Sequence, residues 1–290
     1  MKHCILNVAD GEFRGAQERL KESLLGAAGY RGDLQLWTDT FPPGSPTQDQ
    51  SPMAFKPFAF QHAFTQGYDV ALWLDASMIA VRSVTPLLAR AASVGVYLWG
   101  NGASCGEWAS DDILERFGIS RERSFQVEEI VSCVVGISNR HPTGRQFLAE
   151  WLERARDGSS FRGVPPGQHW SSSRTNADGQ VSRDPRVKGH RWDQTAASLI
   201  AHRLRIPIAH LDCTDVIHYA NNTWAYVPDI PLTVRLLQNR DFKAGVLGSA
   251  ERWGGPGAWR RAARLPRRLV KTAKACVRSI LIRWEFRRRQ

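Results

Sequence analysis

The chain has 290 residues, of which 42% are hydrophobic and 23% are charged, and its formal net charge is +11. This length suits one sizeable domain with an appendage, and the composition excludes a fibrous or disordered protein. The excess charge is local: residues 257–290 hold twelve Lys or Arg against one acid, Glu285, while basic and acidic side chains balance in the rest of the chain.

The cysteines and the N-terminus indicate where the protein is kept. The five cysteines are widely spread and form no Cys-x-x-Cys pair, which predicts a reducing compartment and no structural zinc. The first ten residues offer only about six apolar positions, too few for a signal peptide or a membrane span. We therefore expect a cytoplasmic protein.

The first 75 residues alternate between strand and helix patterns. Residues 3–9, 33–38 and the run from Val70 are apolar and strand-like, whereas 14–28 and 53–66 have helical spacing. This alternation is typical of parallel crossover units, so the expected fold class is α/β.

The later elements are expected at less regular intervals. Helices are expected at 85–93, 110–117, from Pro142, and at 193–204, and strands at 95–99, 130–137 and 206–211, with Gly100 to Gly102 ending the strand at 95–99. Residues 158–189 lack periodicity, which indicates either disorder or a lid or acceptor loop.

Asp75 is the most informative single residue. It ends the apolar run Val70–Leu74, and ligands in open α/β sheets bind beyond the carboxyl ends of strands. An Asp in this place can also cap a helix or form a turn. Asp75 gains meaning from its companions, Lys56-Pro57-Phe58 before it and His190-Arg-Trp-Asp-Gln194 after it.

This ordered set resembles the nucleotide-sugar glycosyltransferases of the GT-A fold. In that family a Lys-Pro helix precedes a strand that ends in a Trp-Leu-Asp-Ala-Asp type motif, and an Asp-Gln pair begins a later helix. Asn7-Val-Ala-Asp-Gly11 adds to the likeness, which spans roughly residues 1–225. The resemblance implies a mixed, mainly parallel sheet flanked by helices over a catalytic domain of residues 1–250.

The resemblance also assigns residues to the nucleotide-sugar donor. A carboxylate beside the ribose and a countercharge for the diphosphate are what such a donor needs. The donor-binding candidates are Asp10, Gly11, Arg14, Lys56, Asp75 and Ser77.

The metal that the family uses, Mn or Mg, is in question here. Ser77 replaces the second carboxylate of the Asp-X-Asp motif, and a hydroxyl is a weaker ligand for these ions. Asp75 alone could anchor the ion, another acid could complete the site, or Lys56, Arg14 and Arg82 could replace the ion as fixed cations. His218 is a candidate metal or diphosphate ligand, or alternatively a core histidine.

The catalytic candidates lie at or just before the start of the helix expected at 193–204. Asp193 and Gln194 could bind the donor sugar or the acceptor, and Asp193 or His190 could act as the general base. Asp193 could also simply cap its helix. Sequence spacing does not decide between these roles.

Residues 251–290 are predicted to form a basic amphipathic helical tail. Apolar residues recur at helical spacing among cations, a composition typical of a helix on an anionic membrane surface. The candidate membrane contacts are Trp259, Arg260, Arg261, Arg267, Arg268 and Trp284. The alternatives are a solvated tail and an arm that binds nucleic acid, and the composition favours the membrane surface over both.

We therefore predict a glycosyltransferase that moves a sugar from a nucleotide-diphosphate donor to a glycan or lipid-linked acceptor. Bacterial surface polysaccharide synthesis on the inner face of the cell membrane would suit such an enzyme. The alternative is a non-catalytic protein of the same fold that binds sugar nucleotides or glycans as a scaffold.

Overall fold

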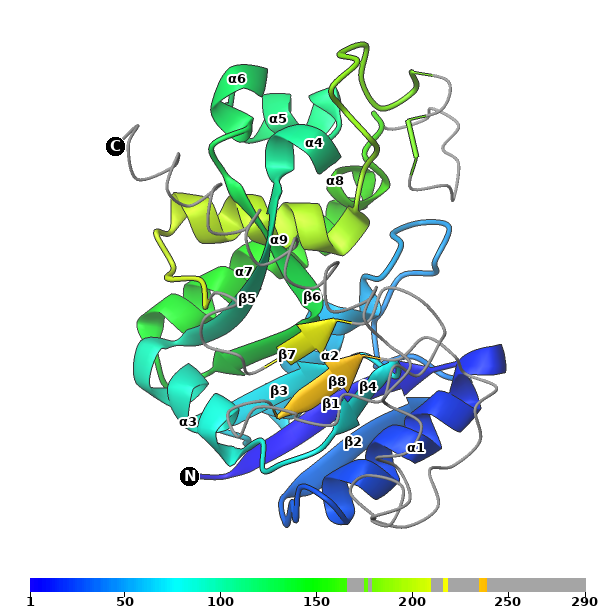
Figure 1. The fold of residues 1–290 in the computed structure, drawn as a ribbon, viewed down its shortest axis with the longest axis vertical. Helices are drawn as coiled ribbons and strands as arrows, with labels where there is room; N and C mark the ends of the chain where they lie inside the picture. Colours follow the sequence, from blue (N-terminus) through cyan, green and yellow to red (C-terminus); the bar gives the residue numbers. More distant parts are fainter. Residues whose placement is uncertain (166–174, 177–178, 210–215, 219–234, 239–290) are drawn as a thin grey trace, which may run out of the picture.

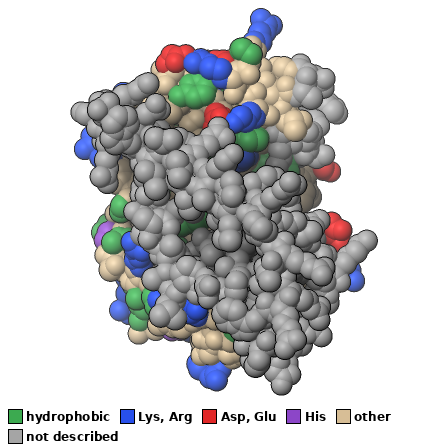
Figure 2. Space-filling view, in the orientation of Figure 1, with side chains coloured by type: hydrophobic (Ala, Val, Ile, Leu, Met, Phe, Trp, Pro, Cys, Tyr) green, Lys and Arg blue, Asp and Glu red, His purple; other side chains and the backbone are tan. Residues whose placement is uncertain are grey.

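The computed structural model describes residues 1–165, 175–176, 179–209, 216–218 and 235–238 (Figure 1). The predicted tail, with Trp259, Trp284 and its arginines, lies outside the described residues. On the face drawn in Figure 2, both basic and acidic side chains of the described part reach the surface. None of the described helices is long and apolar enough to cross a membrane.

A five-stranded sheet forms the centre of the molecule, in the order β2-β1-β3-β6-β5. Strand β1 (His3–Ala9) runs parallel to β2 (Asp33–Thr38) and β3 (Val70–Leu74), whereas β6 (Glu128–Ser138) runs antiparallel to both β3 and β5 (Val96–Ser104). All strands except β6 therefore point the same way, and the predicted mixed, mainly parallel α/β sheet is confirmed.

Side chains alternate between the two faces of this sheet, and helices cover both (Figure 1). On β3, Ala71 and Trp73 join one apolar cluster, while Val70, Leu72 and Leu74 join the other. The first cluster packs against α2 (Phe55–Thr65), α7 (Pro142–Asp157) and α9 (Trp192–Arg203); the second packs against α1 (Arg14–Leu25) and α3 (Thr85–Val94).

A second, three-stranded sheet lies beyond β3 in the order β4-β8-β7. It joins β4 (Met78–Ala80) to β8 (Leu236–Gln238) and β7 (Val216–His218). The chain thus turns at Asp75 from one sheet into the other, and β8 brings Gln238 close to that turn. The backbone of His218 lies in β7, while its side chain is outside the described set.

Short helices complete the described chain. They are the 3₁₀ turn η1 (Gly11–Phe13), α4 (Cys105–Trp108), α5 (Asp111–Arg116), α6 (Arg121–Ser124) and α8 (Ser159–Arg162). Helix α5 begins as predicted, because the Ser110 hydroxyl accepts a hydrogen bond from the Ile113 N–H at 3.3 Å.

The prediction that Gly100 ends a strand was wrong. Strand β5 continues to Ser104, and its register against β6 shifts on both sides of Gly100. A Cβ atom at Gly100 would lie 2.1 Å from the carboxylate oxygen of Glu128. The glycine therefore permits a close approach within an irregular strand, where a turn was expected.

Candidate active site

A pocket of about 430 Å³ opens at the carboxyl ends of β1 and β3. Asp10 follows β1 and Asp75 follows β3, so the two parallel strands bring both acids to the same edge of the sheet. The first turns of α2 and α9 contribute Lys56 and Asp193 to the pocket lining. This is the edge at which open α/β sheets bind ligands.

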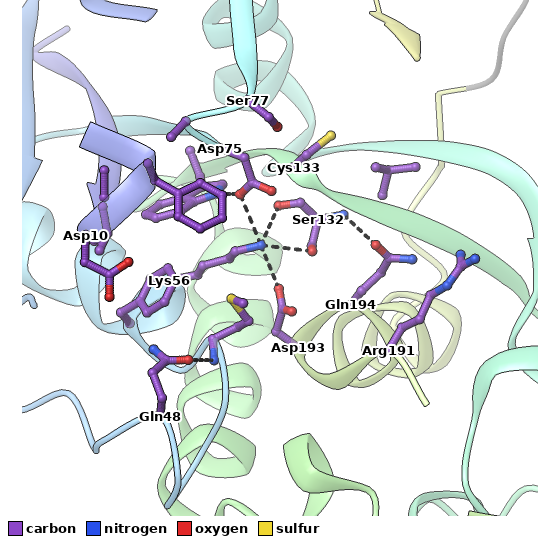
Figure 3. Close-up of a pocket in the computed structure, with 18 of the residues that line it drawn as sticks. Asp10, Gln48, Lys56, Asp75, Ser77, Ser132, Cys133, Arg191, Asp193 and Gln194 are labelled. Carbon is purple, nitrogen blue, oxygen red and sulfur yellow. Dashed lines mark hydrogen bonds and ion pairs between the residues drawn. The ribbon is translucent and has the colours of Figure 1, made fainter. Parts of the chain in front are cut away.

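The Lys56 ammonium lies at the centre of a polar cluster in this pocket (Figure 3). Its Nζ is 3.2 Å from Oδ1 of Asp75 and 3.0 Å from Oδ2 of Asp193. It also donates to the hydroxyl and the carbonyl of Ser132 at 3.0 and 3.2 Å. One cation therefore connects groups from α2, β3, β6 and α9.

The alternation of the strands explains why these groups meet. Trp73 faces the side of the sheet that α2 covers, and Asp75, two positions later, lies on the same side. On β6, Val131 and Cys133 belong to the opposite apolar cluster, which leaves Ser132 between them directed at Lys56. The buried strands therefore place these polar groups on one face.

The charges of the cluster stabilise one another. Burial by itself lowers the pKa of Lys56, but the carboxylates of Asp193 and Asp75 outweigh this effect, and the net pKa is raised. Burial raises the pKa of Asp193, and Lys56 opposes this shift. The cation and at least one carboxylate are thus held in a site from which water is largely excluded, since Lys56 and Asp193 are both only 3% exposed.

Asp75 is the member of the cluster that faces the open pocket. Its side chain is 33% exposed, and its Oδ1 accepts a hydrogen bond from the Trp73 indole N–H at 2.7 Å as well as contacting Lys56. The backbone N–H of Asp75 donates to the Cys133 carbonyl at 2.9 Å. Within the described residues, Oδ2 makes no hydrogen bond or ion pair, so it remains available to a ligand.

The position of the missing second carboxylate is filled by a neutral pair. The Ser77 hydroxyl accepts a hydrogen bond from the Gln238 amide at 3.1 Å, and both side chains line the pocket. The described residues place no group of three His, Cys, Asp or Glu side chains together for a metal ion. They fit Mg²⁺ or Mn²⁺ only as an ion held by Asp75 together with substrate phosphates and water, a pattern that Mg²⁺ accepts.

Aromatic rings line part of the pocket, and one of them, Phe13, donates its backbone N–H to the Asp10 carbonyl at 2.9 Å. Phe41 stacks on Phe55 with centroids 5.5 Å apart and an interplanar angle of 14°, and Phe55 in turn contacts Trp73. Phe13 and Phe41 are partly exposed, at 37% and 36%. Exposed ring faces of this kind suit a nucleobase or a sugar ring.

Of the predicted donor-binding residues, Asp10, Lys56, Asp75 and Ser77 line the pocket. Gly11 and Arg14 do not; both contact Asp39, which is also outside the lining. The Gly11 N–H donates to Asp39 at 3.3 Å, and Arg14 forms an exposed ion pair with Asp39 at 2.7 Å. Gly11 has φ +50, so it makes the tight turn after β1. Arg82 is also outside the lining.

Of the three predicted catalytic residues near the start of α9, two line the pocket and one does not. Asp193 and Gln194 line the pocket, and Gln194 accepts a hydrogen bond from the Ser132 N–H at 3.5 Å. His190 is outside the lining and is only 3% exposed.

Backbone groups engage both ring nitrogens of His190. Nδ1 accepts from the Ser110 N–H at 3.4 Å, and Nε2 lies 3.1 Å from the Ser160 carbonyl. Burial lowers the pKa of His190 to about 4. His190 therefore lies outside the lining of this pocket, and its role as a general base stays a prediction.

Sequence reasoning missed several polar residues of the pocket, among them Ser132, Arg191 and Gln238. Ser132 is a polar position inside the apolar run 130–137, and that interruption was the available signal. Arg191 lies within the motif that drew attention to Asp193, yet the motif gave it no role. Gln238, which holds Ser77, comes from far along the chain and carried no signal.

Comparison with known proteins gave matches among solved structures only. No protein-family model matches the sequence, and no curated protein matches it either. The bifunctional glycosyltransferase WbbM is 9% identical, with 90% of this chain and 51% of that chain covered and a TM-score of 0.48. The chain therefore spans about half the length of WbbM.

Two further solved structures match along nearly their whole length. Mouse xyloside xylosyltransferase 1 is 11% identical, with 83% of this chain and 98% of that chain covered and a TM-score of 0.48. The galactosyltransferase LgtC, solved with donor and acceptor sugar analogues, is 12% identical, with 91% and 96% covered and a TM-score of 0.38. All three are glycosyltransferases, the class of enzyme that the sequence motifs resemble.

Proposed function

We propose that the protein is a glycosyltransferase that transfers a sugar from a nucleotide-diphosphate donor. The observation that carries this proposal is the cluster of Asp75, Lys56 and Asp193 in a pocket at the carboxyl edge of the sheet. These three residues belong to the motifs on which the family resemblance rests. Their contacts with one another support a shared role.

In this proposal the nucleoside lies against the exposed rings of Phe13 and Phe41, with Phe13 beside Asp10. The open oxygen of Asp75 binds the ribose and orients the diphosphate, while Asp193 and Gln194 hydrogen-bond the donor sugar or the acceptor hydroxyl. A divalent ion, when bound, would be held by Asp75 and would supply countercharge for the leaving diphosphate.

Lys56 has a supporting role in this arrangement. Its ammonium already contacts two carboxylates and Ser132, so its role is to fix the positions of these groups and not to bind the ligand directly. Fixed carboxylates lose little conformational entropy when a sugar binds, which is how preorganised sites gain affinity.

The acceptor is proposed to be a glycan or a lipid-linked sugar, in a pathway such as bacterial surface polysaccharide synthesis. Support comes from the sequence of the tail, whose twelve cations would each contribute about 1 kcal/mol near an anionic surface. Flotation with phosphatidylglycerol vesicles tests this part. The full chain should float with the vesicles and a chain lacking residues 257–290 should not; a full chain that stays with the soluble fraction contradicts the membrane proposal.

Mass spectrometry of donor turnover tests the enzymatic proposal. The protein is incubated with a panel of nucleotide sugars and mixed glycan acceptors, with and without Mn²⁺, and release of nucleoside diphosphate is measured. The variant Asp75→Asn should lose turnover while its unfolding transition stays close to that of the wild type. Donor binding without turnover in the wild type would instead support the non-catalytic scaffold.

A further inference from the structure

Arg191 and Lys56 are the cations among the described residues that line the pocket, and they are placed differently. Figure 3 shows Arg191 and Asp10 on opposite sides of Lys56. Asp10 follows β1, whereas Arg191 immediately precedes α9. Arg191 therefore marks the end of the pocket away from the proposed nucleoside position.

The guanidinium of Arg191 is held in place by its surroundings. It lies over the Trp108 ring, 3.6 Å from the centroid, and its Nη1 is 2.5 Å from Oε2 of Glu129. Within the described residues, Nε and Nη2 have no hydrogen-bond partner, and the side chain is 24% exposed. Stacking and a single ion pair thus fix the group while leaving one edge free.

The carboxyl of Glu129 contacts Arg191 on one side only. Glu129 is fully buried, and burial raises its pKa to about 8, although Arg191 opposes the shift. A guanidinium is always charged, and Glu129 contacts only its Nη1. The far end of the pocket therefore presents a guanidinium with a free planar edge, the geometry that matches carboxylate and phosphate groups.

We propose that Arg191 binds an oxyanion, a carboxylate or a phosphate, on the part of the substrate beyond the nucleoside. This inference rests on the proposed function and specifies its substrate class. The oxyanion can belong to the donor, as the carboxylate of a uronic acid, or to the acceptor, as a phosphate of a lipid-linked sugar. Both would engage the free edge of the same guanidinium.

Isothermal titration calorimetry with matched ligand pairs tests the inference. The donor arm compares UDP-glucose with UDP-glucuronic acid, UDP-galactose with UDP-galacturonic acid, and GDP-mannose with GDP-mannuronic acid. The acceptor arm compares farnesol with farnesyl diphosphate. In one arm the wild type should bind the member with the additional oxyanion more tightly, and Arg191→Gln should weaken the binding of that member by about tenfold or more. Sugar nucleotides whose sugar is uncharged should bind to Arg191→Gln within about twofold of their affinity for the wild type.

Two further variants control for the fold. Arg116→Gln removes an arginine of similar exposure, 26%, which pairs with Asp112 outside the pocket, and it should leave all affinities unchanged. Arg191→Gln combined with Glu129→Gln avoids a buried unpaired carboxylate and should reproduce the loss.

The arm that responds identifies which substrate carries the oxyanion. Unchanged affinity for the anionic member in both arms would overturn the role of Arg191 and leave the proposed function standing. If no sugar nucleotide binds the wild type, whether its sugar is uncharged or carries a carboxylate, the proposed function itself would be overturned.

Discussion

Nζ of Lys56 and Oδ2 of Asp193 lie 3.0 Å apart, and both side chains are almost fully buried. The first turns of α2 and α9 supply them, from opposite halves of the chain. A buried pair of this kind contributes little net stability as a pair, but loss of one partner leaves an uncompensated charge in the interior. The pair therefore makes the site sensitive to single substitutions.

Lys56→Met should destabilise the protein by about 3–5 kcal/mol, because two carboxylates would then face each other without a cation. Urea unfolding followed by fluorescence measures the change. Lys21→Met, which removes an exposed lysine paired with Glu18 on α1, should change stability by less than about 0.5 kcal/mol. The double variant Lys56→Met with Asp193→Asn should recover part of the loss; equal stability of Lys56→Met and the wild type would contradict the electrostatic reading.

Trp73→Phe should impair catalysis more than folding. The substitution removes the indole N–H that donates to Asp75 at 2.7 Å, and a hydrogen bond to a charged group is worth about 1.5–3 kcal/mol. Turnover should fall about tenfold or more, with a smaller change in KM. Trp99→Phe, which alters a tryptophan that is equally buried but does not line the pocket, serves as the control and should retain turnover. Similar turnover in the two variants would argue against a positioning role for Trp73.

Phe41→Ala should weaken donor binding by about five- to tenfold, since stacking of a ring on an aromatic face contributes about 1 kcal/mol or more. Stability should change little, because Phe41 is 36% exposed. Calorimetry gives the affinity, and Leu25→Ala, at an exposed position on α1, is the matched control. Donor affinity at the wild-type level would place the nucleoside elsewhere in the pocket.

His190 should make the protein less stable in acid. Its folded pKa of about 4 lies below the usual value of 6.5, so the unfolded chain binds the proton more readily. The contribution is present above pH 6.5 and is lost as the pH falls toward 4. Urea unfolding at several pH values should show this slope in the wild type and a flatter one in His190→Gln. An identical slope in both proteins would show that His190 is not the group responsible.

Much of the fold was predictable because local patterns decide it. The strands at 3–9 and 33–38 match the structure residue for residue, since buried strands read as short apolar runs with clear ends. The antiparallel direction of β6 was not predictable, because a buried run looks the same in either direction. The strand end expected at Gly100 was wrong for a similar reason, because a glycine in a sequence can indicate either a turn or a close approach of another side chain to the backbone.

The candidate site was predictable where motifs mark residues, and not where packing decides. Lys56, Asp75, Asp193 and Gln194 do meet, as their motifs indicated. His190 shares a motif with Asp193 but points into the interior toward Ser110 and Ser160, a direction that sequence spacing does not encode. The partner of Ser77 came from β8, which no local pattern links to that position.

The most direct measurement of the central claim is calorimetric titration of a sugar-nucleotide panel into wild-type protein and Asp75→Asn, with and without Mn²⁺. Asp33→Asn, at the opposite edge of the sheet where Asp33 accepts from Tyr68, is the matched control. We predict saturable binding of at least one sugar nucleotide by the wild type and by Asp33→Asn, and its loss in Asp75→Asn. Equal affinity in all three proteins would contradict the assignment of this pocket to the donor.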